Sequence, residues 1–486
     1  MSKEILNLEP KAIWKHFYSL TQIPRPSGHE AACIAFMKKF GEDLGLETVV
    51  DPVGNVIIRK PATPGMENRK GVVLQGHLDM VPQKNSDKTH DFEKDPIETL
   101  IDGEWVKANG TTLGADNGMG VAATMAILEA KDLQHGMVEA LFTIDEETGM
   151  TGAFGLRPGY LKGDILMNLD SEDEGELYIG CAGGTNGNIT YKYNEVDVAA
   201  GSIAYKLNIT GLKGGHSGVD IHLGRGNANK IMNRFLKEAA NEFGLHIATL
   251  NGGSLRNAIP RESFAIVTIP TAKKDAFLAK LKEFETIVKK ELSAVEPDLK
   301  MNATTADMPS KVMDTKCQKT FIDAIYACPN GVVRMSNAME GLVETSNNLA
   351  IIQIKNGIAT ALCLLRSSVD SAKSDLESQM QSVFHLAGAE IIFDGQYPGW
   401  KPNPDSPILK KMLDIYNNQF GKVPKIYAIH AGLECGLLGG VYPNWDMISF
   451  GPTIRFPHSP DEKVNIASVT KFWDFLVETL KNVPVK

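Results

Sequence analysis

The sequence predicts an α/β protein in which a parallel-rich mixed sheet with helices on both faces is interrupted by an inserted α+β domain. Apolar strand segments alternate with helical segments up to about residue 200 and again after about residue 390. Strands that are apolar along their whole length are typical of parallel sheets covered on both faces. Between these regions the strands alternate in polarity, which favours antiparallel pairing. We therefore expect residues 1–200 and 390–486 to form one domain and residues 201–389 to form the insertion.

The first stretch provides most elements of the interrupted domain. A helical pattern covers residues 11–44 and is broken by Pro24 and Pro26. A second helix is expected at residues 118–130. Strands are expected at residues 55–59, 71–75, 138–144 and 164–169.

The middle stretch has a different pattern. Helices are expected at residues 227–242 and 276–292, and strands at 204–209, 264–269 and 360–365. A Gly/Pro-rich passage at residues 388–407 is expected to close the insertion. The pattern of apolar strands alternating with helices then returns, with helices expected at 407–420 and from 467, and strands at 425–429 and 447–450.

Composition excludes several classes of protein. The 486 residues are 43% hydrophobic and 22% charged, as in soluble globular chains. With 50 basic and 59 acidic residues, the net charge of −9 argues against nucleic acid as a partner. No apolar run approaches the roughly 18 residues of a membrane span. The six cysteines include no C-x-x-C pair, and the N-terminal stretch MSKEILNLEPKAIWKHF lacks a signal-peptide core, so we expect a cytoplasmic protein with reduced thiols.

Imidazole and carboxylate groups follow the predicted strands or lie in loops near them. They are His77 and Asp79, Asp116, the pair Glu146 and Glu147, Asp170, and His458 in a Pro-bounded loop. In open α/β sheets, ligands bind beyond the carboxyl ends of the strands. Two histidines and three carboxylates in converging loops suit a borderline divalent metal such as zinc.

Each of these motifs also has a structural explanation when taken alone. An H-x-D sequence often consists only of polar surface or core residues without a functional role, and a Glu-Glu pair is often only part of a solvated turn. Asp116 could be a helix N-cap. Their joint placement favours the metal site. With two metals, one carboxylate must bridge, and a pair of ions about 3.5–4 Å apart activates a water molecule. One of the paired glutamates then remains free as a general base.

One motif competes with the metal hypothesis. The segment from Gly118 to Ala123 fits G-x-G-x-x-A, the dinucleotide-binding fingerprint. That fingerprint should follow directly on an apolar strand, but here it follows the loop-like segment ANGTTLGADN. The sequence also contains no G-x-S-x-G elbow and no Walker motif, which disfavours serine hydrolases and ATPases.

The middle stretch adds three candidates, each with a structural alternative. His216 in GLKGGHSG and Asn257 in LRNAIPRE could be turn residues, and Arg366 in LCLLRSS could form a surface ion pair. In the functional interpretation they provide an oxyanion donor, an amide that binds substrate backbone, and a fork for a substrate carboxylate.

The motifs together resemble a known family. The segments LQGHLDMVPQKN, GTTLGADNGMG, DEETGMTGAFGL, GLKGGHSG, LRNAIPRE, IHAGLECG and GPTIRFPHSPDE are similar to those of the co-catalytic dinuclear zinc exopeptidases, which include carboxypeptidase G, succinyl-diaminopimelate desuccinylase, peptidase T and carnosinase. The resemblance covers the whole chain. It implies a catalytic domain interrupted by a lid, and a homodimer.

The resemblance also implies the roles of individual residues. His77 and Asp170 would complete one metal site, Glu147 and His458 the other, and Asp116 would bridge two divalent ions, zinc being expected and cobalt or manganese substituting. Glu146 would be the general base, and Asp79 would orient His77. His216, Asn257 and Arg366 would bind substrate from the lid, while His430 and Glu434 receive no role.

The implied activity is hydrolysis of dipeptides with an unblocked N-terminus, including Xaa-His. An N-acyl amino-acid deacylase or desuccinylase on the same fold is the alternative, because fold does not determine the reaction. A binding protein with a structural metal is a third possibility, against which the spare carboxylate of Glu146 argues. Hinges between the two domains are expected near Gly201 and at residues 388–398.

Overall fold

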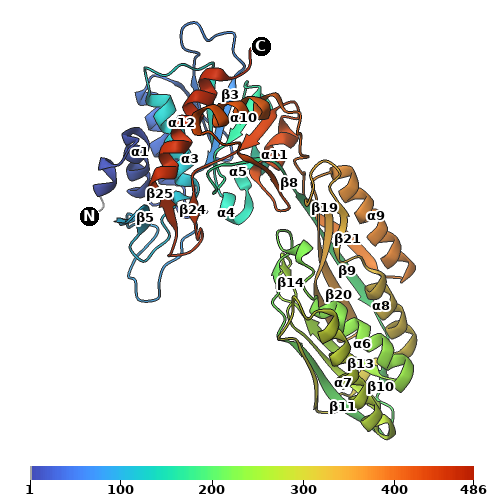
Figure 1. The fold of residues 1–486 in the computed structure, drawn as a ribbon. Helices are drawn as coiled ribbons and strands as arrows, with labels where there is room; N and C mark the ends of the chain where they lie inside the picture. Colours follow the sequence, from blue (N-terminus) through green and yellow to red (C-terminus); the bar gives the residue numbers. More distant parts are fainter. Residues whose placement is uncertain (1–2) are drawn as a thin grey trace. The chain divides into compact units, whose positions relative to one another are not determined.

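The computed structural model describes residues 3–486, and the chain divides into two structural units (Figure 1). The first unit contains the chain up to Gly180 together with Pro402–Ala428 and Leu433–Lys486. The second unit contains Cys181–Lys401 and Ile429–Gly432. The chain therefore leaves the first unit and returns to it, as an inserted domain requires.

A mixed sheet of eight strands forms the centre of the first unit, in the order β1-β2-β6-β3-β7-β23-β8-β22. Strands β3, β6, β7 and β23 run parallel to one another, while β1 pairs antiparallel with β2, β2 with β6, and β8 with β23. The bounds are β1 Glu47–Val50, β2 Val56–Lys60, β3 Val72–His77, β6 Val138–Thr143, β7 Ile165–Asn168, β8 Glu176–Cys181, β22 Lys425–Ile429 and β23 Asp446–Ser449.

The central strands are covered on both faces. Every residue of β3, β6 and β7 is buried, although successive side chains of a strand point to opposite faces. This burial explains their continuously apolar sequences. Because these strands are parallel, their carboxyl ends meet at one edge, where β3 ends at His77 and β6 ends three residues before Glu146.

Helices of the first unit pack on this sheet. Helix α3 is buried along most of its length and contacts both α1 and β3, while α2 contacts β1 and β2. The helices are α1 Lys11–Thr21, α2 Ala31–Asp43, α3 Ala115–Glu129, α4 Glu146–Gly149, α5 Thr151–Gly155, α10 Pro407–Phe420, α11 Glu434–Val441 and α12 Ile466–Asn482, preceded by the 3₁₀ turn η1 Glu4–Asn7. A small sheet, β24-β25-β5-β4, contains β4 Thr99–Asp102, β5 Trp105–Ala108, β24 Ile454–Arg455 and β25 Lys463–Asn465.

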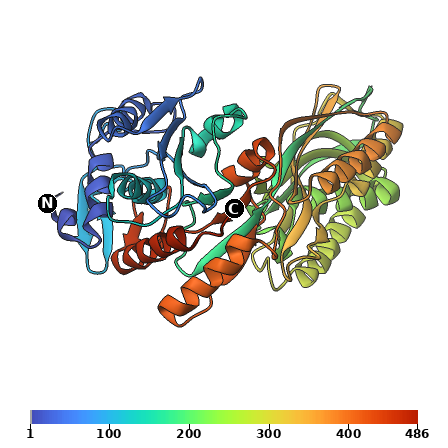
Figure 2. The ribbon, with the colours of Figure 1, turned by 90° about the horizontal axis from the view of Figure 1, so that it is seen from above.

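An antiparallel sheet dominates the second unit. Its main order is β16-β11-β15-β13-β19-β20-β9-β21, with β18 paired to β19. The strands are β9 Gly183–Lys192, β11 Ser202–Thr210, β13 His246–Gly252, β15 Ser263–Pro270, β16 Lys300–Thr305, β18 Gly331–Met335, β19 Val343–Lys355, β20 Ile358–Ser367 and β21 Glu390–Tyr397. Figures 1 and 2 show α6, α7, α8 and α9 along one side of this sheet. Their bounds are Ala228–Phe243, Lys274–Glu291, Thr315–Ala327 and Asp370–Leu386.

This sheet consists of two modules with the same β-α-β-β-α-β order. One module is β11-α6-β13-β15-α7-β16, and the other is β9-α8-β19-β20-α9-β21. In both, the first strand lies between the third and fourth. The modules join where β13 pairs antiparallel with β19, and α6 packs against α8 at this junction. Shorter elements complete the unit: β10 Glu195–Asp197 with β17 Lys311–Met313, β12 Gly215–His216 with β14 Ala258–Ile259, and the 3₁₀ turns η2 Ile221–Leu223 and η3 Thr271–Lys273.

Most predicted elements are confirmed within a few residues. The Gly/Pro-rich passage at 388–407 contains Lys401, where the main segment of the second unit ends, and β21 in its first half still pairs with β9 inside that unit. Both expected hinge regions, near Gly201 and at 388–398, lie within the second unit rather than at its ends. The domain limits at residues 200 and 390 remain a prediction. Within the described range, no helix combines the length and the apolar character needed to cross a membrane.

Candidate functional site

The carboxyl edge of the parallel strands gathers most of the predicted metal-binding side chains of the first unit. His77 is the last residue of β3, and Asp170 follows β7 by two residues. Asp116 begins α3 with extended rather than helical dihedral angles, which turns its side chain away from the regular helix path. Glu147 lies in the short helix α4 after β6, and His458 lies in the loop between β24 and β25.

These five side chains form two groups that share Asp116. In the first, His77 Nε2 lies 3.1 Å from Asp116 Oδ1 and 3.4 Å from Asp170 Oδ1. In the second, His458 Nε2 lies 3.2 Å from Asp116 Oδ2 and 2.9 Å from Glu147 Oε2. Asp116 thus directs a different carboxylate oxygen to each histidine, which is the arrangement that a bridging ligand needs.

The chemistry of these atoms fits two divalent cations. In each group the ligand atoms lie within 4.8 Å of one another. Glu147 Oε1 is buried and has no hydrogen-bond partner in the described part of the chain, and Asp170 Oδ1 is buried with only its 3.4 Å ion pair to His77. Buried acceptors without partners are costly, and a cation bound by imidazole nitrogen and carboxylate oxygen would satisfy them. A third group of His77, Glu146 and Glu147 meets the same distance criterion, so geometry alone leaves open which glutamate is the ligand.

The titration behaviour of the cluster reflects its excess of carboxylates. Burial disfavours the charged imidazole of His77, but the negative charge of Asp170 and the contacts with Asp116 raise the pKa of His77 well above its ordinary value. Burial, opposed by the charge of His77, raises the pKa of Asp170 to about 7. Hydrogen bonds to Asp116 and Glu147 raise the pKa of His458 to about 11. The carboxylates therefore favour positive charge within the cluster, and a bound metal ion could supply it in place of the imidazole protons.

Asp79 connects the two sides of the cluster. Its carboxylate lies 3.3 Å from His77 Nδ1 and accepts hydrogen bonds from the backbone N–H groups of Glu146 (3.0 Å) and Glu147 (3.2 Å). The hydroxyl of Ser27 donates to the same carboxylate at 2.8 Å. Burial opposes ionisation, but these contacts hold the pKa of Asp79 well below its ordinary value. The residue therefore fixes both His77 and the start of α4.

The carboxyl group of Glu146 lies among other acidic side chains. Burial is the main influence that raises its pKa well above the ordinary value, and the charges of Asp170 and Glu434 act in the same direction while His77 opposes them. Glu434 itself is buried, accepts hydrogen bonds from Gln75 (2.6 Å) and Thr143 (2.8 Å), and retains one oxygen without a partner. A raised pKa makes a carboxylate a stronger proton acceptor than an ordinary glutamate, which suits a general base.

The glycines of the competing dinucleotide motif have a packing explanation. A Cβ atom at Gly118 would lie 2.7 Å from the guanidinium of Arg25, and one at Gly120 would lie 2.5 Å from the carbonyl oxygen of Leu169. Both glycines therefore allow α3 to approach its neighbours closely.

His216 of the second unit has a defined tautomer. Its Nδ1 accepts hydrogen bonds from the backbone N–H groups of Gly218 (3.2 Å) and Val219 (3.0 Å). Burial and the charge of Arg366 lower the pKa of His216. A neutral imidazole that accepts at Nδ1 carries its proton on Nε2, so His216 presents a donor.

Arg366 and His430 form a buried, donor-rich cluster in the second unit. Arg366 donates from Nη1 to the Tyr397 hydroxyl at 3.0 Å, whereas its Nε has no partner among the residues described. His430 Nε2 lies 2.7 Å from the hydroxyl oxygen of Ser346. Burial, followed by the charge of Arg366, lowers the pKa of His430 to about 3. The Nε–H of Arg366 is therefore free to donate to an anionic group.

Asn257 is placed differently from the other two predicted residues of this unit. It is exposed, and its backbone carbonyl accepts a hydrogen bond from the N–H of Ser217 at 2.9 Å. This bond attaches the Asn257 loop to the loop that contains His216. Sequence reasoning did not find Ser346 or Tyr397, because a hydroxyl in a strand gives no motif.

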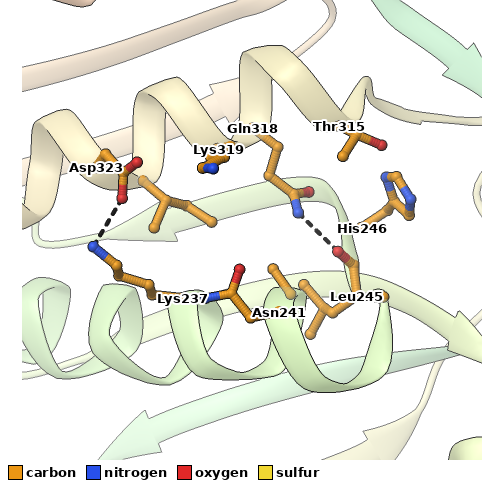
Figure 3. Close-up of a pocket in the computed structure, with 11 residues that line it drawn as sticks. Lys237, Asn241, Leu245, His246, Thr315, Gln318, Lys319 and Asp323 are labelled. Atoms are coloured by element: carbon orange, nitrogen blue, oxygen red, sulfur yellow. Dashed lines mark hydrogen bonds and ion pairs between the residues drawn. The ribbon is translucent and has the colours of Figure 1, made fainter.

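A cavity of about 320 Å³ elsewhere in the second unit contains none of the predicted site residues (Figure 3). It lies between α6 and α8. Two pairs of its lining groups are in contact with each other, Lys237 with Asp323 at 2.8 Å and Gln318 with the carbonyl of Leu245 at 2.7 Å. These contacts would have to break before the four groups could bind a ligand through the same atoms.

Comparison with known proteins identifies the family. The model described as Peptidase family M20/M25/M40 matches residues 73–482. The cytosol non-specific dipeptidase of Escherichia coli (strain K12) is 47% identical over 483 residues, which cover 99% of this chain and 100% of that protein. The crystal structure of aminoacylhistidine dipeptidase from Vibrio alginolyticus is 52% identical, with a TM-score of 0.95 over 100% of both chains.

A more distant structure shows likeness of fold alone. Aminopeptidase PepT from Bacillus cereus ATCC 10987 is 15% identical, with a TM-score of 0.57 over 98% of this chain and 99% of that one. The predicted fold class and the predicted family are both confirmed by these matches. The chain belongs to peptidase family M20/M25/M40.

Proposed function

We propose that the protein is a metal-dependent dipeptidase that hydrolyses dipeptides with a free N-terminus, Xaa-His dipeptides among them. The names of the two full-length relatives support this activity. The observation that carries the proposal is the pair of histidine–carboxylate groups that share Asp116.

Five residues are proposed as metal ligands. His77 and Asp170 would hold one ion, Glu147 and His458 the other, and Asp116 would bind both. Zinc is the expected metal, since imidazole and carboxylate ligands suit it, and cobalt or manganese would substitute. Two such ions, when bound, would polarise the scissile carbonyl and lower the pKa of a water molecule.

We propose that Glu146 carries out the two proton transfers of the reaction. Its carboxylate would accept a proton from the attacking water and then deliver it to the leaving amine. Asp79 would keep His77 in one orientation and, through the amides of Glu146 and Glu147, hold α4 in place. This division of roles separates the two adjacent glutamates into base and ligand.

Three residues of the second unit are proposed to bind substrate. The Nε2–H of His216 would donate to the oxygen on which negative charge develops. Arg366 would bind the C-terminal carboxylate through a charge-assisted hydrogen bond, and Asn257 would bind the peptide backbone through its amide. The donor-rich surroundings of Arg366 support the anion-binding role.

A substrate panel tests this proposal against its alternative. Metal-free protein is reconstituted with zinc, cobalt or manganese and given free dipeptides, including Xaa-His, beside N-acyl and N-succinyl amino acids. We expect hydrolysis of the free dipeptides. Preferential cleavage of the acylated compounds would instead favour a deacylase or desuccinylase, and no cleavage of either would favour a binding protein.

We further propose that the protein acts in the cytoplasm as a homodimer. The E. coli relative is named a cytosol dipeptidase, which supports the location. Sedimentation velocity at several concentrations tests the assembly, and cell fractionation tests the location. A concentration-independent monomer would contradict the dimer.

A further inference from the structure

The loop that carries Asp116 is held by two buried charged side chains. Arg25 and Glu462 are each only 2% exposed, and they come from opposite ends of the chain. Both lie in the first unit, and both contact the backbone of Leu113–Asp116 rather than its side chains. Neither residue belongs to the proposed ligands or to the proposed base.

Glu462 accepts hydrogen bonds from four consecutive amides. Its Oε2 receives the N–H groups of Leu113 (2.7 Å) and Gly114 (2.9 Å), and its Oε1 receives those of Ala115 (2.7 Å) and Asp116 (3.2 Å). Four donors directed at two oxygens form an environment for a carboxylate, since a protonated acid or an amide would face a donor with a donor. The single side chain therefore determines the path of the backbone into Asp116.

Arg25 holds the carbonyl side of the same loop. Its Nη2 donates to Gly114 O at 2.5 Å, and its Nη1 donates to Leu78 O (2.8 Å) and Asp79 O (2.9 Å). The guanidinium thereby joins the Asp116 loop to the segment that follows His77. A Cβ atom at Gly114 would lie 2.6 Å from Nη2, so the glycine provides the space for this contact.

Glu462 also connects the Asp116 loop to the loop of His458. It follows His458 by four residues, and its backbone N–H donates to the carbonyl of Ser459 at 2.9 Å. His458 itself has a φ of +57°, a conformation that a side-chain-bearing residue adopts only when its surroundings hold it there. The Glu462 carboxylate anchors this loop to the amides beside Asp116.

We propose that Arg25 and Glu462 are positioning residues for the metal centre, holding the two oxygens of Asp116 in register with His77 on one side and His458 on the other. This inference rests on the proposed two-metal function. Arg25 fixes the Asp116 loop to the His77 segment, and Glu462 fixes it to the His458 loop. The two residues therefore act unequally on the two ions.

Glu462→Gln tests the inference, because glutamine keeps the shape but turns an NH₂ group toward two of the four amides. Residues that orient metal ligands typically change metal affinity by about 10–100-fold when mutated. We expect zinc affinity, measured by chelator competition, to fall by about that factor for one of the two ions. The weakened ion should be the one that His458 binds, and Arg25→Lys should weaken the His77 ion more.

Glu139→Gln is the matched control. Glu139 is also a buried carboxylate of the first unit, and it accepts the amides of Lys162 (2.7 Å) and Gly163 (2.8 Å), but it lies near the start of β6, at the opposite end from Glu146. We expect this variant to lower the Tm of the metal-free protein, as Glu462→Gln should, while both ions bind as in the wild type. Tm without metal thus reports folding, and affinity reports positioning.

Two results would overturn the inference. One is wild-type affinity for both ions in Glu462→Gln, and the other is an equal loss of affinity in Glu139→Gln. Wild-type protein that bound no metal would overturn the proposed function as well. Wild-type protein that bound two ions beside an unaffected Glu462→Gln variant would overturn only the positioning role.

Discussion

The candidate site residues of the two units differ in which buried atoms they leave without partners among the described residues. In the first unit these atoms are carboxylate oxygens of Glu147 and Glu434, and Asp170 Oδ1 has only a 3.4 Å ion pair with His77. In the second unit the corresponding atom is a guanidinium nitrogen, Arg366 Nε.

Unpaired buried groups indicate what each region binds. A buried polar atom without a partner costs free energy on the order of 1–3 kcal/mol, more when it is charged. Unpaired carboxylate oxygens favour the binding of a cation, and an unpaired guanidinium nitrogen favours the binding of an anion. At a metallopeptidase site the dipeptide zwitterion provides a carboxylate and the metal provides positive charge. The comparison therefore predicts loss of metal binding when the first unit is altered and weaker substrate binding when the second unit is altered.

The largest loss is expected for Asp116→Ala. Removing the ligand shared by both groups should abolish binding of both ions and reduce turnover further than loss of a general base, which contributes on the order of 10²–10⁴-fold. Metal content per chain and dipeptide hydrolysis measure this. Asp102→Ala, which removes an exposed carboxylate of the same unit, serves as the control. One ion retained at full occupancy would show that Asp116 does not bridge.

Glu146→Gln should separate chemistry from metal binding. Glutamine keeps the size of the side chain but cannot accept the proton, so turnover should fall by at least about 10²-fold. Metal content should stay at the wild-type level, because Glu147 rather than Glu146 is the proposed ligand. If metal and activity were lost together, the roles of the two glutamates would be reversed.

Arg366→Lys should give a smaller and substrate-dependent effect. A hydrogen bond to a charged group contributes about 1.5–3 kcal/mol, so losing the guanidinium should raise KM for free dipeptides by roughly 10-fold or more. C-terminally amidated dipeptides should be affected less, since they have no carboxylate to lose. Equal fractional losses on both substrates would exclude the carboxylate-binding role.

The sequence predicted the first unit better than the second for a physical reason. Parallel strands bring their carboxyl ends to one edge, so His77, Glu147 and Asp170 could be expected together from their places after apolar strands. His77 lies within 4.8 Å of ligand atoms of Asp170 in one group and of Glu147 in another, which agrees with that expectation. Only the resemblance to a known family proposes which glutamate is the ligand and which is the base, and that assignment stays a prediction.

Contacts to backbone were outside the reach of sequence patterns. Glu462 and Arg25 contact the backbone amides and carbonyls of a loop. Because every residue type has these backbone groups, no residue pattern in the loop indicates the contact. Strand β21 was missed because its glycine and aspartate suggest a turn, whereas pairing with β9 outweighs that local preference. Helix α9 was missed because its buried side is narrow, formed by Lys373, Leu376, Met380 and Phe384.

Reconstitution of the metal-free protein tests the central claim most directly. Zinc is added in steps, bound metal per chain is measured by equilibrium dialysis, and hydrolysis of an Xaa-His dipeptide is followed in the same samples. We predict no hydrolysis without metal, binding of two ions per chain, and activity that rises with their binding. Metal-free protein as active as the reconstituted protein, or binding that stops below two ions at full activity, would contradict the two-metal dipeptidase.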